Sequence, residues 1–227
     1  MIKIGVVIAD DKEFEAFMAH WNGGEVVSEK FYGLESVKIS LEDKEIYAVL
    51  GLIGKVNITF ATAMLISEKK VDVVLNTGYS GAVHKLRRGD LVIGSDYVEC
   101  DFDLTAIGYK LGEKPGQEYV YKASEKLLDV AKEVFVDAPV VPLGCGDMFL
   151  TDSNLKKKYY EHFGIFAFDM ESAAIASVCK RCGVEFISVR KISDDSEDSA
   201  AEDYREMNNS CDKCFSEILS MMINSLV

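Results

Sequence analysis

The chain has 227 residues, of which 48% are hydrophobic, 28% charged and 10% aromatic. This composition can bury a sizeable core, and it excludes disordered, collagen-like and small disulfide-stapled proteins. The net charge of −13 disfavours nucleic acid and anionic membrane surfaces as partners, because like charges repel. No apolar run approaches the roughly 18 residues of a membrane helix. Met1–Asp11 is typical of a first strand, not of a signal peptide, so we expect a cytoplasmic protein.

Short runs rich in Val and Ile predict strands, and apolar residues spaced by three or four predict helices between them. The predicted strands are Lys3–Ala9, Val37–Leu41, Ile46–Gly51, Val71–Asn76, Leu91–Val98, Pro139–Leu143, Ile165–Phe168 and Glu185–Arg190. The predicted helices are Glu13–Trp21, Lys55–Lys69, Ala123–Val136, Asn154–Phe163, Met170–Lys180 and Ala201–Leu226. This alternation predicts an α/β protein, a three-layer α/β/α sandwich around a twisted, mixed, largely parallel sheet. With three prolines and no linker or repeat, residues 1–227 are expected to form a single domain.

Two Cys-x-x-Cys pairs, Cys179/Cys182 and Cys211/Cys214, have the spacing of a zinc site. The second pair, however, falls on the apolar stripe of the predicted last helix. That stripe consists of Tyr204, Met207, Cys211, Cys214, Ile218 and Met222. We therefore favour buried thiols in a reducing cytoplasm, with no metal and no cofactor, and keep a zinc or redox protein as an alternative.

Open α/β sheets bind ligands beyond the carboxyl ends of their strands. The residues there are acids, small residues and one aromatic: Asp10, Asp11, Glu13, Asn76–Gly81, Gly144–Phe149, Asp169–Glu171 and Arg190–Asp195. Cleaving a bond to a sugar anomeric carbon needs a proton donor, a base for water and hydrogen bonds to ribose hydroxyls. Separated carboxylates and an aromatic ring supply these groups. Taken singly, each signal is also typical of a tight turn or of an acid at a helix start.

Seven segments extend this pattern: Lys3-Ile4-Gly5 with Glu13, Gly54-Lys55-Val56-Asn57, Asn76-Thr77-Gly78, Asp103–Tyr109, Gly146–Phe149, Asp169–Ala176 and Val189–Asp194. Their order, from about residue 2 to residue 205, resembles the 5′-methylthioadenosine/S-adenosylhomocysteine nucleosidases of the purine nucleoside phosphorylase-like superfamily. The resemblance implies a nucleoside phosphorylase-like fold and a hydrolase that releases adenine from a nucleoside, in the context of methionine salvage.

The resemblance also implies residue roles. Asp194 matches the general acid that protonates purine N7, Glu13 matches the residue that activates water, and Arg190 lies beside it. The substrate-binding positions are Glu171 and Met170 at the ribose, Phe149 and Leu150 at the purine, Ser193 supporting the acid, Tyr204 closing the site, and Ile53, Tyr79 and Asp10. Leu104, Ile107 and Pro115 match positions that complete a partner's site, so a homodimer is implied. The alternative for Met170 and Phe149 is that they are core residues, and the alternative for Arg190 is that it is a structural ion-pair partner of Asp169.

Three residues depart from the family near the expected reaction centre: Leu52 for Gly, Tyr79 for Ser or another small residue, and Asp10 for Met. If Asp10 faces the pocket and not solvent, a buried carboxylate disfavours a bare methylthio group. Our hypothesis is a 5′ pocket narrowed by Tyr79 and made polar by Asp10, suited to a polar or cationic 5′ group or to a hydroxyl.

The loop after the first strand carries acids from Asp10 to Glu13, where phosphorylases of the superfamily hold phosphate with arginine. Acids there repel phosphate, so water is the better acceptor. The alternatives that stay open are another nucleosidase or phosphorylase of the superfamily, and an inactive nucleoside-binding protein in which Tyr79 blocks the water.

Overall fold

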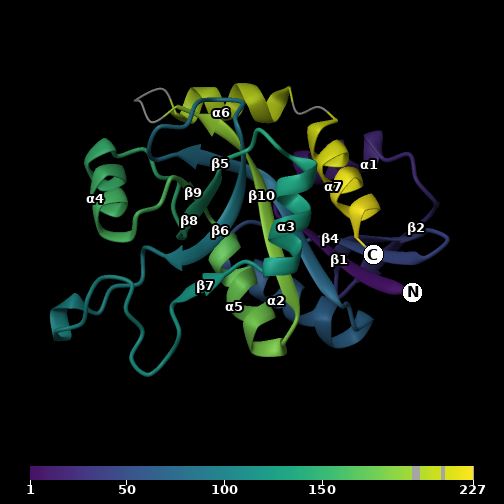
Figure 1. Ribbon diagram of the computed structural model, residues 1–227, viewed down its shortest axis with the longest axis horizontal. Helices are drawn as coiled ribbons and strands as arrows, with labels where there is room; N and C mark the ends of the chain where they lie inside the picture. Colours follow the sequence, from purple (N-terminus) through teal and green to yellow (C-terminus); the bar gives the residue numbers. More distant parts are fainter. Residues whose placement is uncertain (196–199, 211–212, 227) are drawn as a thin grey trace.

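A computed structural model describes residues 1–195, 200–210 and 213–226 (Figure 1). Four strands lie side by side in parallel, in the order β4 (Lys44–Leu50), β1 (Ile2–Ile8), β5 (Val73–Ala82) and β10 (Glu185–Asp194). β10 then pairs with β6 (Leu91–Glu99), β6 with β8 (Val140–Cys145), β8 with β9 (Ala167–Asp169), and β9 returns to β5. The strands β5, β10, β6, β8 and β9 therefore close into a barrel.

An antiparallel wing extends the sheet beyond β4, made of β3 (Leu34–Ser40) and β2 (Glu25–Phe31). The short strand β7 (Val120–Lys122) pairs with β6. The predicted α/β class and mixed sheet are confirmed. The three-layer sandwich is not confirmed, because the sheet closes on itself, and the sheet is not largely parallel, since half of the described strand pairings are antiparallel.

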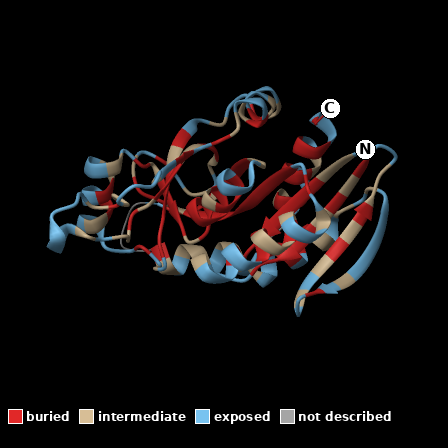
Figure 2. Cartoon of the chain, turned by 90° about the horizontal axis from the view of Figure 1, so that it is seen from below, coloured by how far each residue is buried: buried red, intermediate tan, exposed pale blue. Residues whose placement is uncertain are grey.

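Helices cover the sheet on two sides. α1 (Asp11–His20) and α3 (Glu125–Val134) both contact α7 (Cys214–Ser225), whereas α2 (Lys55–Met64) packs against α5 (Ser172–Cys182). α4 (Ser153–Phe163), α6 (Ala200–Asn209), the short 3₁₀ helix Thr105–Ile107 and the π-helical turn Leu65–Lys69 complete the described helices. Figure 2 shows the buried residues concentrated along the strands and along the inner faces of these helices. None of the described helices is long and apolar enough to cross a membrane.

Two local predictions are wrong, and two strands, β2 and β7, were missed. The segment Asn76–Gly81, expected beyond a strand, continues β5 to Ala82. The last predicted helix, Ala201–Leu226, is two helices, α6 and α7. β2 was not predicted, since most of its residues are exposed and no alternating buried face marks it.

The exchange of partners along β5 creates the space for a site. β5 pairs with β1 only as far as Val7 and Asn76, and with β9 from Gly81 onward. Between Asn76 and Gly81, β5 pairs with neither β1 nor β9. The chain that leaves β1 continues into α1 at this point. Ligands of α/β sheets bind at such switch points.

Candidate active site

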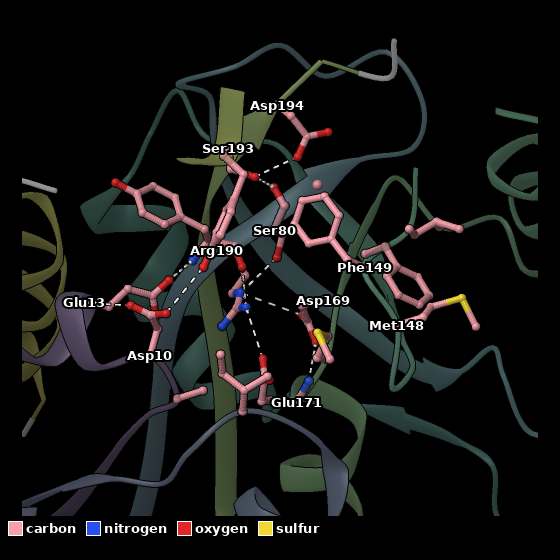
Figure 3. A pocket seen from close by; sticks show the side chains of 18 of the residues that line it. Asp10, Glu13, Ser80, Met148, Phe149, Asp169, Glu171, Arg190, Ser193 and Asp194 are labelled. Carbon is pink, nitrogen blue, oxygen red and sulfur yellow. Dashed lines mark hydrogen bonds and ion pairs between the residues drawn. The ribbon is translucent and has the colours of Figure 1, made fainter. Parts of the chain in front are cut away.

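A cavity of about 200 Å³ lies at this switch point. It is lined by residues from β5, β9, β10, α1, α4 and α6 and from the segments that follow β1, β4, β8 and β9 (Figure 3). The predicted site residues that line it are Asp10, Glu13, Ile53, Tyr79, Phe149, Leu150, Met170, Glu171, Arg190, Ser193, Asp194 and Tyr204. The structure thus brings together residues more than 190 positions apart in the sequence.

Arg190 is the buried cation at the base of the cavity, 3% exposed. Its guanidinium donates to Ser80 Oγ at 2.9 Å, to Asn76 Oδ1 at 3.2 Å and to the carbonyl of Tyr79. Nε lies 3.7 Å from Asp169 Oδ2, and Nη2 lies 3.7 Å from Glu171 Oε2. The interpretation of Arg190 as an ion-pair partner of Asp169 is therefore correct, and the same guanidinium also faces Glu171.

Glu13 reaches the cavity from the first turn of α1. Its Oε1 accepts a hydrogen bond from the backbone N–H of Tyr79 at 2.8 Å. Burial raises the pKa of Glu13 to about 8, against the opposing effects of Arg190 and of this hydrogen bond. Glu13 therefore holds or shares a proton near neutral pH, which suits a group that exchanges protons with water.

Glu171 is the residue before α5 and is 4% exposed. Asp169 Oδ1 accepts from the N–H groups of Glu171 and Ser172 at 2.9 and 2.8 Å, which fixes the start of the helix. Glu171 Oε1 accepts from the N–H of Gly54 at 3.1 Å. Burial raises the pKa of Glu171 to about 7, although Arg190 acts in the opposite direction.

Asp194 lies at the end of β10 and is 1% exposed. Its Oδ2 is 2.7 Å from Ser193 Oγ, and its Oδ1 is 3.5 Å from Lys156 Nζ. Burial raises its pKa, with Ser193 and Lys156 acting in the opposite direction. The neighbouring Asp195 is exposed, and its Oδ1 accepts from the N–H of Arg88 at 2.6 Å.

Aromatic rings form the open side of the cavity. Phe149 is 47% exposed, and its ring lies 5.3 Å from that of Tyr204 in an edge-on arrangement. The loop carrying Phe149 is held by Asp147, whose Oδ1 accepts from the N–H of Lys55 at 2.8 Å. Phe149 is therefore a ring at the mouth of the cavity and not a core residue.

Asp10, Tyr79 and Leu52 are the three residues that depart from the family pattern. Asp10 lines the cavity, caps α1 by accepting from Lys12 N–H at 3.0 Å, and lies 3.4 Å from the Tyr204 hydroxyl. Tyr79 donates its hydroxyl to the carbonyl of Met207 at 3.3 Å. Leu52 has φ +65°, a conformation that favours glycine, and is 45% exposed.

Leu104, Ile107 and Pro115 do not line the cavity within one chain. Ile107 is 70% exposed. Cys179 is buried as predicted, Cys182 is exposed, Cys214 is half-buried, and Cys211 lies outside the described residues. No group of three or more metal-binding side chains occurs among the residues that the structure describes.

Ala9, Lys156 and Phe168 line the cavity but lie outside the segments that the sequence singled out, whereas Ser80, Gly81, Met148 and Asp169 lie inside those segments but were given no role in binding. Lys156 carried no signal, because it begins a run of three lysines that is typical of a solvated helix face.

The chain is similar to known proteins over nearly its whole length. Residues 3–224 match the phosphorylase superfamily, to which the chain therefore belongs. A 5′-methylthioadenosine/S-adenosylhomocysteine nucleosidase of Shewanella loihica is 33% identical over 210 residues, which cover 89% of this chain and 90% of that protein. The chain thus belongs to the family of these nucleosidases, which are N-glycosyl hydrolases.

Solved structures agree with this assignment. A mutant futalosine hydrolase of Helicobacter pylori has a TM-score of 0.94 and 27% identity, with all of both chains covered. A mutant nucleosidase of the same organism, with 5′-methylthioadenosine in its active site, has a TM-score of 0.93 and 26% identity, again with both chains fully covered. These likenesses confirm the nucleoside phosphorylase-like fold.

Proposed function

We propose that the chain hydrolyses the N-glycosidic bond of 5′-methylthioadenosine, S-adenosylhomocysteine or a related 5′-modified adenosine, releasing adenine, with Asp194 as acid and Glu13 as base. The observation that carries this proposal is the placement of Glu13, Glu171 and Asp194 on different sides of one cavity (Figure 3). All three carboxyl groups are buried and have raised pKa values.

Asp194 acts on the purine. A buried carboxyl group with a raised pKa can hold a proton and deliver it to N7, so that the base leaves as a neutral molecule. Ser193 orients the carboxyl group through Oδ2. The ring of Phe149 and the backbone of Leu150 flank the purine.

Glu13 acts on water. It takes one proton from the water that attacks the anomeric carbon, while Arg190 and the N–H of Tyr79 hold the carboxyl group in place. Glu171 accepts from the ribose hydroxyls beside Met170, and this interaction strengthens as positive charge develops on the sugar.

Adenine release should not require phosphate, because the segment from Ala9 to Glu13 carries the acids Asp10 and Asp11 and no arginine that could hold an anion. We expect equal rates with and without phosphate in an assay of free-base release from methylthioadenosine, S-adenosylhomocysteine, 5′-deoxyadenosine and adenosine. Turnover that depends on phosphate and yields ribose 1-phosphate would overturn the hydrolase assignment. Binding of all four nucleosides without turnover would favour an inactive binding protein.

The 5′ pocket is made polar by Asp10 and narrowed by Tyr79, and we expect it to prefer a polar or cationic 5′ group or a hydroxyl. Replacing Asp10 by Asn removes the charge but keeps an oxygen to cap α1. The ratio of kcat/KM for methylthioadenosine to that for adenosine should rise about tenfold in Asp10→Asn. Asp11→Asn, an exposed neighbour, is the control. An unchanged ratio in Asp10→Asn would show that the carboxylate does not contact the 5′ group.

A homodimer completes the proposal, with Leu104, Ile107 and Pro115 reaching the partner's site. Ile107 is exposed in the single chain and lies on the segment between β6 and β7. Sedimentation of the wild type against Ile107→Asp tests this: the variant should shift towards monomer and lose activity together. The cytoplasmic location and the absence of nucleic acid partners remain predictions from the sequence.

A further inference from the structure

The purine end of the cavity holds a buried lysine that the mechanism above does not use. Lys156 lies in α4, is 2% exposed, and lines the cavity with Asp194. Its Nζ makes one long contact, 3.5 Å to Asp194 Oδ1, and has no other hydrogen-bond partner among the described residues. An ammonium group carries three donor hydrogens, and leaving buried donors unpaired is costly. The ammonium group therefore has donor capacity left for a ligand at this end of the cavity.

The chemistry of purines limits what that occupant presents. N7 and the substituent on C6 share one edge of the purine ring. In adenine this edge combines an acceptor at N7 with a donor amino group, whereas a 6-oxopurine presents two acceptors, N7 and O6. If Asp194 meets N7, the group beside Asp194 meets the C6 substituent. Two groups stand there: the oxygen Oδ1, which accepts, and the Lys156 ammonium, which donates.

We propose that Lys156 is a specificity-determining residue whose ammonium donates to O6 of a 6-oxopurine, so that the chain hydrolyses hypoxanthine nucleosides as well as adenine nucleosides. This inference rests on the proposed function, because it requires Asp194 at N7. An adenine amino group donates to Asp194 Oδ1, whereas a 6-oxo group accepts from Lys156. The same reaction centre then serves both bases.

The reaction steps are the same for either base. The bond between C1′ and N9 breaks, its electron pair goes to the purine, and N7 receives the proton of Asp194. The water oxygen bonds to C1′ and its proton passes to Glu13. With a 6-oxopurine, the hydrogen bond to O6 also withdraws electrons from the departing ring and draws the ammonium away from Asp194, whose pKa that cation lowers.

The test compares substrates that differ only at C6: 5′-methylthioadenosine against 5′-methylthioinosine, and adenosine against inosine. It uses the wild type, Lys156→Met, which keeps the length of the side chain without the charge, and Lys158→Met as an exposed control on the same helix. We expect the wild type to hydrolyse both members of each pair with kcat/KM values within about tenfold of each other. In Lys156→Met, the ratio of kcat/KM for the 6-oxopurine to that for the 6-aminopurine should fall about 10- to 100-fold, because a hydrogen bond to a charged group is lost only for the former.

Three other results would contradict the inference. Hydrolysis of the 6-aminopurines alone by the wild type would overturn this inference and leave the proposed function intact, even if Lys156→Met fails to fold. An equal fall for both bases in a folded Lys156→Met, checked by its thermal midpoint, would show that Lys156 only supports Asp194. No turnover of any nucleoside would overturn the proposed function and this inference with it.

Discussion

Replacing Asp194 by Asn should lower kcat about 1,000-fold while nucleoside affinity changes only a few-fold. The amide keeps the shape of the carboxyl group and can still accept from Ser193, but it has no acidic proton for N7. An interaction made only in the transition state lowers kcat when it is removed and leaves ground-state binding in place. Single-turnover kinetics together with calorimetric titration of a non-hydrolysable nucleoside analogue measure the two quantities separately.

Asp195→Asn is the matched control for Asp194→Asn. The two acids are adjacent in sequence, but Asp195 is exposed and accepts from the backbone of Arg88 outside the cavity. Its substitution should leave kcat near the wild-type value. Equal losses of turnover and affinity in Asp194→Asn would make Asp194 a structural residue, contrary to its proposed role as an acid.

The sequence predicted most of the cavity wall, because the residues that follow β-strands could be recognised without knowing how the strands pair. It could not predict the closed barrel. Closure depends on β10 pairing with β5 on one side and with β6 on the other, contacts between residues as far apart as Val73 and Glu185. No local pattern of hydrophobic residues carries that information.

Gly78 shows why a segment of β5 resembled a turn. Gly, Ser and Asn are typical of turns, yet Gly78 lies within a strand at φ +150°. A Cβ atom there would lie 2.6 Å from Glu13 Oε2 and 2.9 Å from Arg190 Nη1. The glycine therefore makes room for the Glu13 carboxyl group and the Arg190 guanidinium, which is a tertiary requirement and not a local one.

Lys156 could not be identified for a similar reason. Lys156, Lys157 and Lys158 are adjacent and chemically equal in the sequence, and only the position of α4 against the barrel buries the first of them while the other two stay exposed. Buried lysines are rare, so a run of lysines correctly predicts a solvated surface in most cases. Functional sites are where such regularities fail.

Replacing Glu13 by Gln should lower kcat at least about 100-fold, because the amide cannot take a proton from water. For the wild type, kcat/KM should rise with pH up to about 8, since Glu13 must be ionised to act as a base and its pKa in the folded protein is about 8. The rise should be absent from the residual activity of Glu13→Gln. A pH profile of kcat/KM for both proteins measures this.

The same substitution should change how stability depends on pH. The pKa of Glu13 is raised from 4.5 to about 8 on folding. The proton on Glu13 therefore stabilises the folded state fully below pH 4.5, and this contribution is lost as pH rises towards 8. Gln does not titrate, so the stability of Glu13→Gln does not fall with pH for this reason. Its amide oxygen can still accept from the N–H of Tyr79.

As pH rises between the two pKa values, the free energy of unfolding of Glu13→Gln should therefore increase relative to that of the wild type. The increase should be up to about 1.4 kcal/mol for each pH unit. Urea unfolding at several pH values in this window measures the gain. Glu15→Gln, an exposed acid on the same helix, should follow the wild type. If Glu13→Gln also parallels the wild type at every pH, Glu13 is ionised in the folded protein throughout the window. The carboxylate would then be held by Arg190 and would not be poised to exchange a proton with water.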